Sequence, residues 1–189
     1  MKSLLNIAST TNSSKVLGPG NRFVIWVQGC PFNCHKCIAK DWIPFQKANL
    51  IEIEVLAENI VSQDKISGIT ISGGEPLMQA GRLSKLLDSV SKKKKLNTIV
   101  FTGFSMKELI WKEAHELLER VDVLITGRYH HRKNDNKGLR GSWNQEIHFL
   151  TDEFRGQEEY FFTKKRDIEF SIINDATSLI GIPSKDFKW

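Results

Sequence analysis

The chain has 189 residues, of which 40% are hydrophobic and 26% are charged, and this composition is typical of one globular domain with a substantial core. No apolar run approaches the roughly 20 residues that cross a bilayer, which argues against a membrane protein. The formal net charge is +5, but no aromatic residues interleave with the lysine run at 92–95, which argues against a nucleic-acid partner.

The first 15 residues predict no cleaved targeting segment. One early lysine is followed by only a short apolar patch, without a long apolar stretch and a small-residue cleavage site. A cytoplasmic protein with reduced thiols is therefore expected.

Strand-like and helix-like patterns alternate along the middle of the chain. After a Gly/Pro turn at 18–20, the pattern predicts strands at 22–28, 69–72, 97–103, 121–127, 144–150 and 167–173, and helices at 52–61, 81–93 and 105–121. Such alternation predicts βαβ units with a parallel sheet.

The number of predicted strands is too small for a closed eight-fold barrel. We therefore expect an α/β fold, a single-domain partial (β/α) barrel of mostly parallel strands over 1–189. Its core spans about 18–150, and 151–189 form a C-terminal extension. Glycine and polar residues follow the predicted strands as QGC, SGGE, TGF and TGRY, at the sheet edge where parallel α/β folds bind ligands.

All three cysteines lie in one C-x3-C-x2-C segment, at Cys30, Cys34 and Cys37. An odd number of thiols argues against a disulfide framework, and a nucleophilic cysteine needs no such companions. A structural zinc ion needs four ligands, so a zinc site completed by one histidine remains an alternative. The candidate histidines are His35, His115, His130, His131 and His148. An iron–sulfur cluster held by three thiolates keeps one iron open for another ligand.

This cysteine spacing after one buried strand, with SGGEP at 72–76 after the next, resembles the radical S-adenosylmethionine (SAM) superfamily. The resemblance implies that the three cysteines hold a [4Fe–4S] cluster whose open iron binds the methionine moiety of S-adenosyl-L-methionine. It further implies that Gly73, Gly74 and Glu75 receive the methionine end, with Glu75 offering a carboxylate to the ammonium. Further candidates are Thr102 and Gly103 near the ribose, and Arg128 and Asn144 at the edge of the site; a solvated loop charge is the alternative for Arg128.

Five longer segments are similar to the small glycyl-radical activating enzymes, closest to the activase of anaerobic ribonucleotide reductase. They read GPGNRFVIWVQGCPFNC, ISGGEPLMQ, VFTGF, VDVLITGRY and LRGSWNQEI. The similarity implies reductive cleavage of SAM to a 5′-deoxyadenosyl radical, which takes hydrogen from a glycine Cα of a partner enzyme. The implied partners are a glycyl-radical enzyme or other peptide substrate and a one-electron donor such as flavodoxin or ferredoxin.

Two alternatives remain open from the sequence. One is a compact radical SAM enzyme that modifies a peptide or small molecule, and the other is a non-catalytic zinc or iron–sulfur binding module. The sequence departs from the family pattern at two places. Lys36 stands where the superfamily often has an aromatic residue, and a basic loop at 128–137 follows a Thr-Gly pair where activases have Asp-Gly. Only the second departure bears on the partner. We expect this loop to contact an acidic partner surface.

Overall fold

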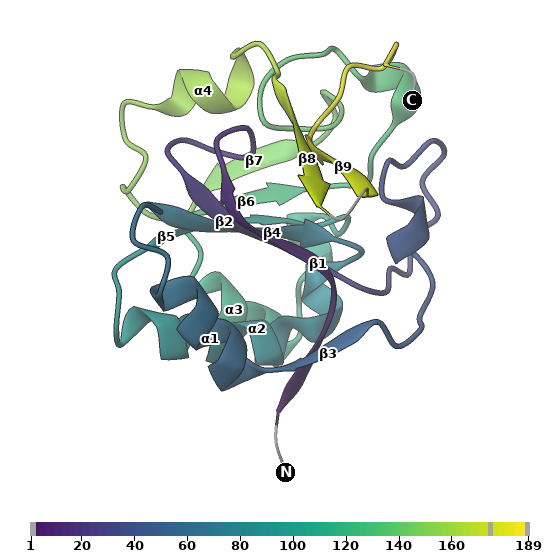
Figure 1. The fold of residues 1–189 in the computed structure, drawn as a ribbon. Coiled ribbons are helices and arrows are strands. Elements are labelled where there is room, and N and C mark those ends of the chain that lie inside the picture. Colours follow the sequence, from purple (N-terminus) through teal and green to yellow (C-terminus); the bar gives the residue numbers. More distant parts are fainter. Residues whose placement is uncertain (1–2, 174–175, 188–189) are drawn as a thin grey trace.

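The computed structural model describes residues 3–173 and 176–187. In this part of the chain, seven strands form one sheet in the order β3-β1-β2-β4-β5-β6-β7, and β8 pairs with β9 in a separate hairpin (Figure 1). The strand bounds are β1 (Leu4–Ser14), β2 (Arg22–Val27), β3 (Asn49–Glu52), β4 (Gly68–Gly73), β5 (Asn97–Phe101), β6 (Val123–Thr126), β7 (Glu146–Phe149), β8 (Ile168–Ile173) and β9 (Ala176–Gly181).

The middle of the sheet is parallel, as the alternating pattern predicted. Strands β2, β4, β5 and β6 pair in parallel, whereas β1, β3 and β7 join antiparallel at the two sides. Every residue of β2 is buried, as expected for a strand covered on both faces. In the described chain β3 and β7 are the two edges and do not pair with each other, so the sheet is open. The predicted α/β fold is confirmed.

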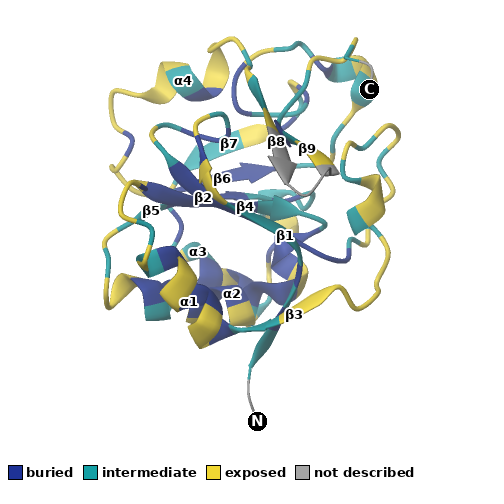
Figure 2. Ribbon diagram, viewed as in Figure 1, coloured by how far each residue is buried: buried dark blue, intermediate teal, exposed yellow. Residues whose placement is uncertain are grey.

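The helices that connect the parallel strands lie on one face of the sheet. They are α1 (Ile53–Val61), α2 (Ala80–Ser91) and α3 (Lys112–Leu118), drawn below the sheet in Figure 1. Their apolar sides form a core cluster with the strands, which includes Leu56, Leu83, Leu117 and Ile71. Figure 2 shows the same division, with dark blue central strands and exposed outer sides on the helices. No helix among the described residues is long and apolar enough to cross a membrane.

The C-terminal extension covers the other face of the sheet (Figure 1). Phe154 and Phe161, the latter in α4 (Glu158–Phe162), pack with Ile99 of β5. Ile180 of β9 packs with Trp26 of β2. The extension therefore contributes apolar side chains to the core over the sheet face that α1, α2 and α3 leave uncovered.

Several parts of the chain differ from the sequence-based expectation. The helix predicted at 105–121 is broken: Ser105 caps a short 3-10 helix, Met106–Glu108, and α3 begins only at Lys112. Glu108 accepts the backbone N–H of Ser105 at 2.7 Å, which closes the first turn as a capping box. Strands β1, β3 and β9 and helix α4 were not predicted. The outer half of β1 is polar, whereas Leu5 and Ile7 in its first half belong to the core, and the strand pairs with both β2 and β3.

Arg22 anchors the end of the sheet opposite to the end that carries the cysteines. Its side chain is fully buried and donates to Thr70 Oγ1 at 2.6 Å, to Asn97 Oδ1 at 2.6 Å and to the Pro19 carbonyl at 3.1 Å. Burial lowers its pKa to about 9. The Gly-Pro-Gly turn before β2 is thus tied to β4 and β5 from within the core.

Candidate functional site

The cysteines lie on the loop that leaves the carboxyl end of β2. This loop returns to its own start: the N–H of Gly29 donates to Trp42 O at 2.9 Å, and the N–H of Cys30 donates to Ile43 O at 2.9 Å. The Gln28 side chain donates to Pro44 O at 2.8 Å, so it stabilises the loop. These contacts hold the two ends of the loop together and leave the cysteines between them.

The three thiols are half-buried neighbours. Burial is the main reason that the pKa of Cys30 is raised to about 11, and the charges of Cys37 and Cys34 raise it further. Burial likewise raises the pKa of Cys37. Among the described residues, no group of three or more His, Cys, Asp or Glu side chains is placed to hold one metal ion.

The glycines after β4 allow that strand to pack directly on the cysteine loop. The N–H of Gly74 donates to Val27 O and the N–H of Glu75 to Gly29 O, both at 2.8 Å. A Cβ on Gly74 would lie 2.4 Å from Gly29 O, and Gly73 has a φ of +108°, which favours glycine. From the sequence, these glycines were expected to let a ligand approach the backbone. In the structure they are also needed for contact between β4 and the cysteine loop.

Glu75 is a buried carboxyl group that joins the ends of β4 and β5. It is 1% exposed. Its Oε1 accepts the N–H of Leu77 at 2.9 Å and the hydroxyl of Thr102 at 2.7 Å, and its Oε2 accepts the N–H of Gly103 at 2.7 Å. Burial raises its pKa to about 7, against the effect of these hydrogen bonds. In the structure, Glu75 therefore holds the ends of β4 and β5 together. Its contact with the ammonium of SAM stays a prediction.

Phe32, in the cysteine loop, joins further elements to the site. A Cβ on Gly103 would lie 2.5 Å from the Phe32 ring, and the Phe104 ring contacts it edge-on with centroids 4.8 Å apart. The guanidinium of Arg128 lies 4.6 Å from the centroid of the Phe32 ring and 3.3 Å from Glu108. Arg128 thus contacts the cysteine loop, although its side chain is also exposed. No local pattern pointed to Phe32 beyond its place between two cysteines.

The segment 140–145 folds back on the end of β6. The Gln145 amide donates to Gly127 O at 2.7 Å, and the Asn144 amide donates to Arg128 O at 3.0 Å. The Asn144 Oδ1 is buried and has no hydrogen-bond partner among the described residues. Such an acceptor is costly unless a further donor reaches it.

The structure thus gathers the predicted residues at one edge of the sheet. The ends of β2, β4 and β5 meet through Gly29, Gly74, Glu75 and Gly103, and the end of β6 adds Arg128. Three neighbouring thiols and no fourth cysteine in the chain fit a four-iron cluster with one iron open to another ligand.

Comparisons with known proteins agree with this arrangement. The family model described as a 4Fe-4S single cluster domain matches residues 16–148. The anaerobic ribonucleoside-triphosphate reductase-activating protein of Enterobacteria phage T4 is 31% identical over 142 residues, which are 72% of this chain and 89% of that protein. The chain belongs to this family of radical SAM activating enzymes. Its expected cofactors, a [4Fe–4S] cluster and S-adenosyl-L-methionine, are those of the family.

Other relatives of this radical SAM activase agree with the assignment. The protein of the same name from Pasteurella multocida is 32% identical over 72% of this chain and 92% of its own length. The pyruvate formate-lyase-activating enzyme of Streptococcus mutans is 33% identical over 63% of this chain and 46% of that enzyme. Among solved structures, QueE from Escherichia coli covers 70% of this chain and 74% of its own, with 18% identity and a TM-score of 0.43. Because the chain belongs to an enzyme family, the alternative of a non-catalytic binding module is wrong.

Proposed function

We propose that this chain generates a glycyl radical in a partner enzyme of the anaerobic ribonucleoside-triphosphate reductase type. The observation that carries this proposal is the meeting of the cysteine loop, the Gly-Gly-Glu segment and the end of β5 at one sheet edge. The sequence relatives described above are named as activating proteins of that reductase or of pyruvate formate-lyase, which supports the choice of partner.

In this proposal Cys30, Cys34 and Cys37 hold the cluster, and Gly73 and Gly74 present backbone to the methionine end of SAM. When bound, the reduced cluster would supply one electron for the cleavage of SAM, and the resulting radical chemistry would remove one hydrogen atom from the substrate. Glu75 keeps the segment 73–75 in register with Thr102 and Gly103. The protein therefore contributes the positions of the two cofactors and of the substrate, while the cofactors carry the chemistry.

A glycine Cα suits this reaction because no side chain twists the resulting radical out of conjugation with its two flanking peptide groups. We further propose that residues 1–189 work as one domain, since the extension shares the core with the sheet. The electron is expected from a one-electron donor such as flavodoxin or ferredoxin.

The direct test is formation of a glycyl radical. The chain is reconstituted with iron and sulfide without oxygen, reduced, and mixed with SAM and the anaerobic ribonucleoside-triphosphate reductase of the same organism. We expect a glycyl-radical signal in electron paramagnetic resonance, with 5′-deoxyadenosine formed in step with it. Formation of 5′-deoxyadenosine without a protein radical would contradict the proposed partner and favour a small-molecule or peptide substrate.

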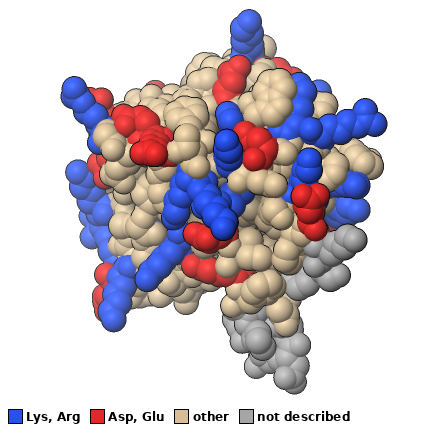
Figure 3. Space-filling model, turned by 90° about the horizontal axis from the view of Figure 1, so that it is seen from above, with Lys and Arg blue, Asp and Glu red and all other residues tan. Residues whose placement is uncertain are grey.

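The loop at 128–137 supplies the surface that we propose for partner docking. Lys133 lies 4.6 Å from the exposed Trp143 ring, and Arg132 is exposed beside it. On the face shown in Figure 3, Lys and Arg side chains alternate with Asp and Glu and do not form one continuous basic surface. Docking would therefore depend on a few cations next to an exposed aromatic ring; aromatic residues and arginine are enriched in protein interfaces.

Reversing two of these charges, with Arg132→Glu and Lys133→Glu together, is expected to slow glycyl-radical formation by about tenfold or more at low salt. The reason is weaker attraction to an acidic partner surface, an effect that salt screens over about 8–10 Å. Cleavage of SAM without partner should keep its rate. An equal fall in the rates of radical formation and SAM cleavage would indicate that the loop belongs to the SAM site. No change in either rate would indicate that its charges are only solvated and contact no partner.

A further inference from the structure

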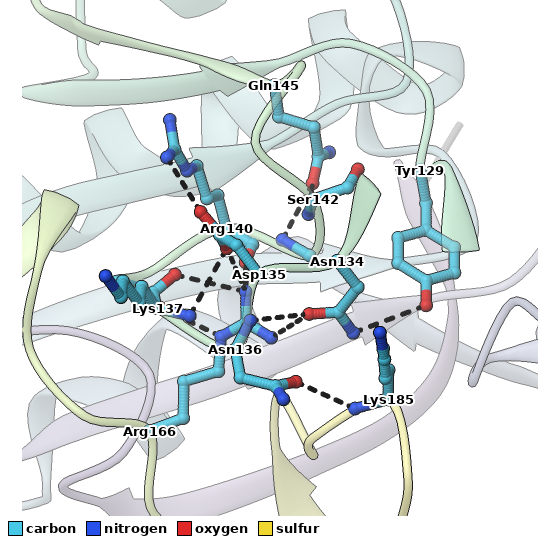
Figure 4. Close-up of polar contacts among 12 residues, drawn as sticks. Tyr129, Asn134, Asp135, Asn136, Lys137, Arg140, Ser142, Gln145, Arg166 and Lys185 are labelled. Carbon is cyan, nitrogen blue, oxygen red and sulfur yellow. Dashed lines mark hydrogen bonds and ion pairs between the residues drawn. The ribbon is translucent and has the colours of Figure 1, made fainter. Parts of the chain in front are cut away.

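Arg166, in the C-terminal extension, shapes the loop that follows β6. Its side chain is only 6% exposed. It donates to Asn134 Oδ1 at 2.7 Å, to Lys137 O at 3.1 Å, to Gly138 O at 3.2 Å and also to Arg140 O (Figure 4). All of these acceptors lie within 134–140, a segment that forms no helix or strand in the described structure. Hydrogen bonds from one buried guanidinium of the extension thus hold this irregular segment together.

The extension also holds the same segment through further backbone contacts. The N–H of Gly138 donates to Lys164 O at 2.9 Å. The N–H of Lys185 donates to Asn136 Oδ1 at 2.8 Å, as Figure 4 shows. The family model ends at residue 148, so these contacts come from a part of the chain that the model does not match.

A run of polar contacts continues from this segment to the cysteine loop. The Asn134 amide donates to the Tyr129 hydroxyl at 3.5 Å (Figure 4). That hydroxyl lies 3.2 Å from His131 Nδ1, and His131 Nε2 lies 3.3 Å from Lys36 Nζ. An ammonium can only donate, so His131 accepts at Nε2 and its proton is on Nδ1, facing Tyr129. Neighbouring Lys36 and burial also lower the pKa of His131, which agrees with a neutral ring.

Lys36 needs such support because of its backbone. It lies between Cys34 and Cys37 and has a φ of +56°, a left-handed conformation that costs free energy in a residue other than glycine. This is also the position where the sequence departs from the aromatic residue common in the superfamily. A residue in a strained conformation persists where its surroundings hold it. Lys36 is exposed, and its ammonium lies 3.3 Å from His131 Nε2.

We propose that Arg166 is a positioning residue, which acts through Asn134, Tyr129, His131 and Lys36 to fix the cysteine loop around the cluster. The proposal rests on the function proposed above, since it presupposes that this loop holds the cluster. The C-terminal extension then takes part in shaping the site, although Arg166 itself touches neither cofactor. Loss of any contact along this run should loosen residues 31–40, which are far from Arg166 in the sequence.

Hydrogen exchange of the full chain tests this coupling without any activity measurement. Arg166→Ala is expected to speed amide exchange within 31–40 by roughly tenfold, as for a local opening that loses one charge-assisted hydrogen bond. Tyr129→Phe, which leaves the contacts of Arg166 intact, should speed exchange in the same segment. The control Arg155→Ala removes an exposed arginine from the extension and should change nothing there. Faster exchange only within 134–140 and the extension would overturn the proposal and leave Arg166 as a local anchor.

The cluster-loaded protein gives a second measurement. In Arg166→Ala and in Tyr129→Phe, the electron paramagnetic resonance spectrum of the reduced cluster with SAM should change, and the double variant should add little to the larger single effect. An unchanged spectrum in both variants would overturn the proposal. If the wild-type chain cleaved no SAM at all, the proposed function would fail, whereas the exchange result for 31–40 would still decide whether the contacts couple the two loops.

Discussion

Alanine in place of any one of Cys30, Cys34 and Cys37 is expected to abolish both the brown absorbance of the reconstituted cluster and the cleavage of SAM. The three thiols are neighbours on one loop, and the chain has no other cysteine to replace a lost ligand. A cluster with two remaining protein thiolates would have two irons without a protein ligand. Iron and sulfide content, absorbance and 5′-deoxyadenosine formation, measured together without oxygen, check this expectation.

His35→Ala is the matched control, because it changes the residue next to Cys34 and separates the cluster from the zinc alternative. An iron–sulfur site held by the three thiols should keep its iron and sulfide in this variant. A zinc site completed by His35 would lose its fourth ligand and bind zinc more weakly. Full SAM cleavage by any of the three cysteine variants would contradict the assignment of the ligands.

The sequence predicts the parallel centre of the fold well, because that prediction depends on local patterns. The candidate site residues also lie at the ends of these strands, where their sequence neighbours position them. The apolar run of β2 and the Gly-Gly-Glu segment after β4 lie next to the residues that they position. The contact between Lys36 and His131 joins residues 95 positions apart, and neither residue has a local pattern that indicates the other. The packing of the Phe32 ring against Gly103 likewise depends on how the ends of β2 and β5 meet, which no local pattern indicates.

The break in the predicted helix at 105–121 has a different cause. Apolar spacing continues across the whole segment, but Glu108 closes a capping box with Ser105 and the chain turns at Leu109, which is buried, while Ile110 is 81% exposed. Burial of Leu109 in the core therefore decides the local conformation over the helical pattern of the sequence.

Glu75→Gln is expected to lower the free energy of unfolding by about 1–3 kcal/mol and to weaken SAM binding about tenfold or more. Both oxygens of Glu75 accept backbone N–H groups, from Leu77 and from Gly103. An amide has only one oxygen, so in either orientation its NH2 group faces one of these donors and leaves it unpaired. The segment 73–75 packs on Gly29, so the disturbance should reach the cysteine loop.

Denaturant unfolding of the full chain and titration of the spectral change on SAM addition measure these two effects. Thr102→Val removes one of the three donors to Glu75 and should cost less, about 1 kcal/mol. Glu116→Gln is the control: its carboxylate on α3 is partly exposed and forms a surface ion pair with Lys112, so the variant should stay within about 0.5 kcal/mol of the wild type. Wild-type stability and SAM affinity in Glu75→Gln would show that the buried hydrogen bonds of Glu75 do not support the site.

The pH dependence of stability provides an independent check on Glu75. Its pKa in the folded chain is about 7, above the ordinary value of 4.5, because burial disfavours the charged form. The folded state therefore binds this proton more tightly than the unfolded state does. The contribution of Glu75 to stability is complete below about pH 4.5 and declines as the pH rises through about 7. Glu75→Gln has no group to titrate at this position, so the difference in unfolding free energy between wild type and variant should shrink from pH 5 to pH 8. A constant difference across this range would mean that Glu75 has the same affinity for its proton in both states.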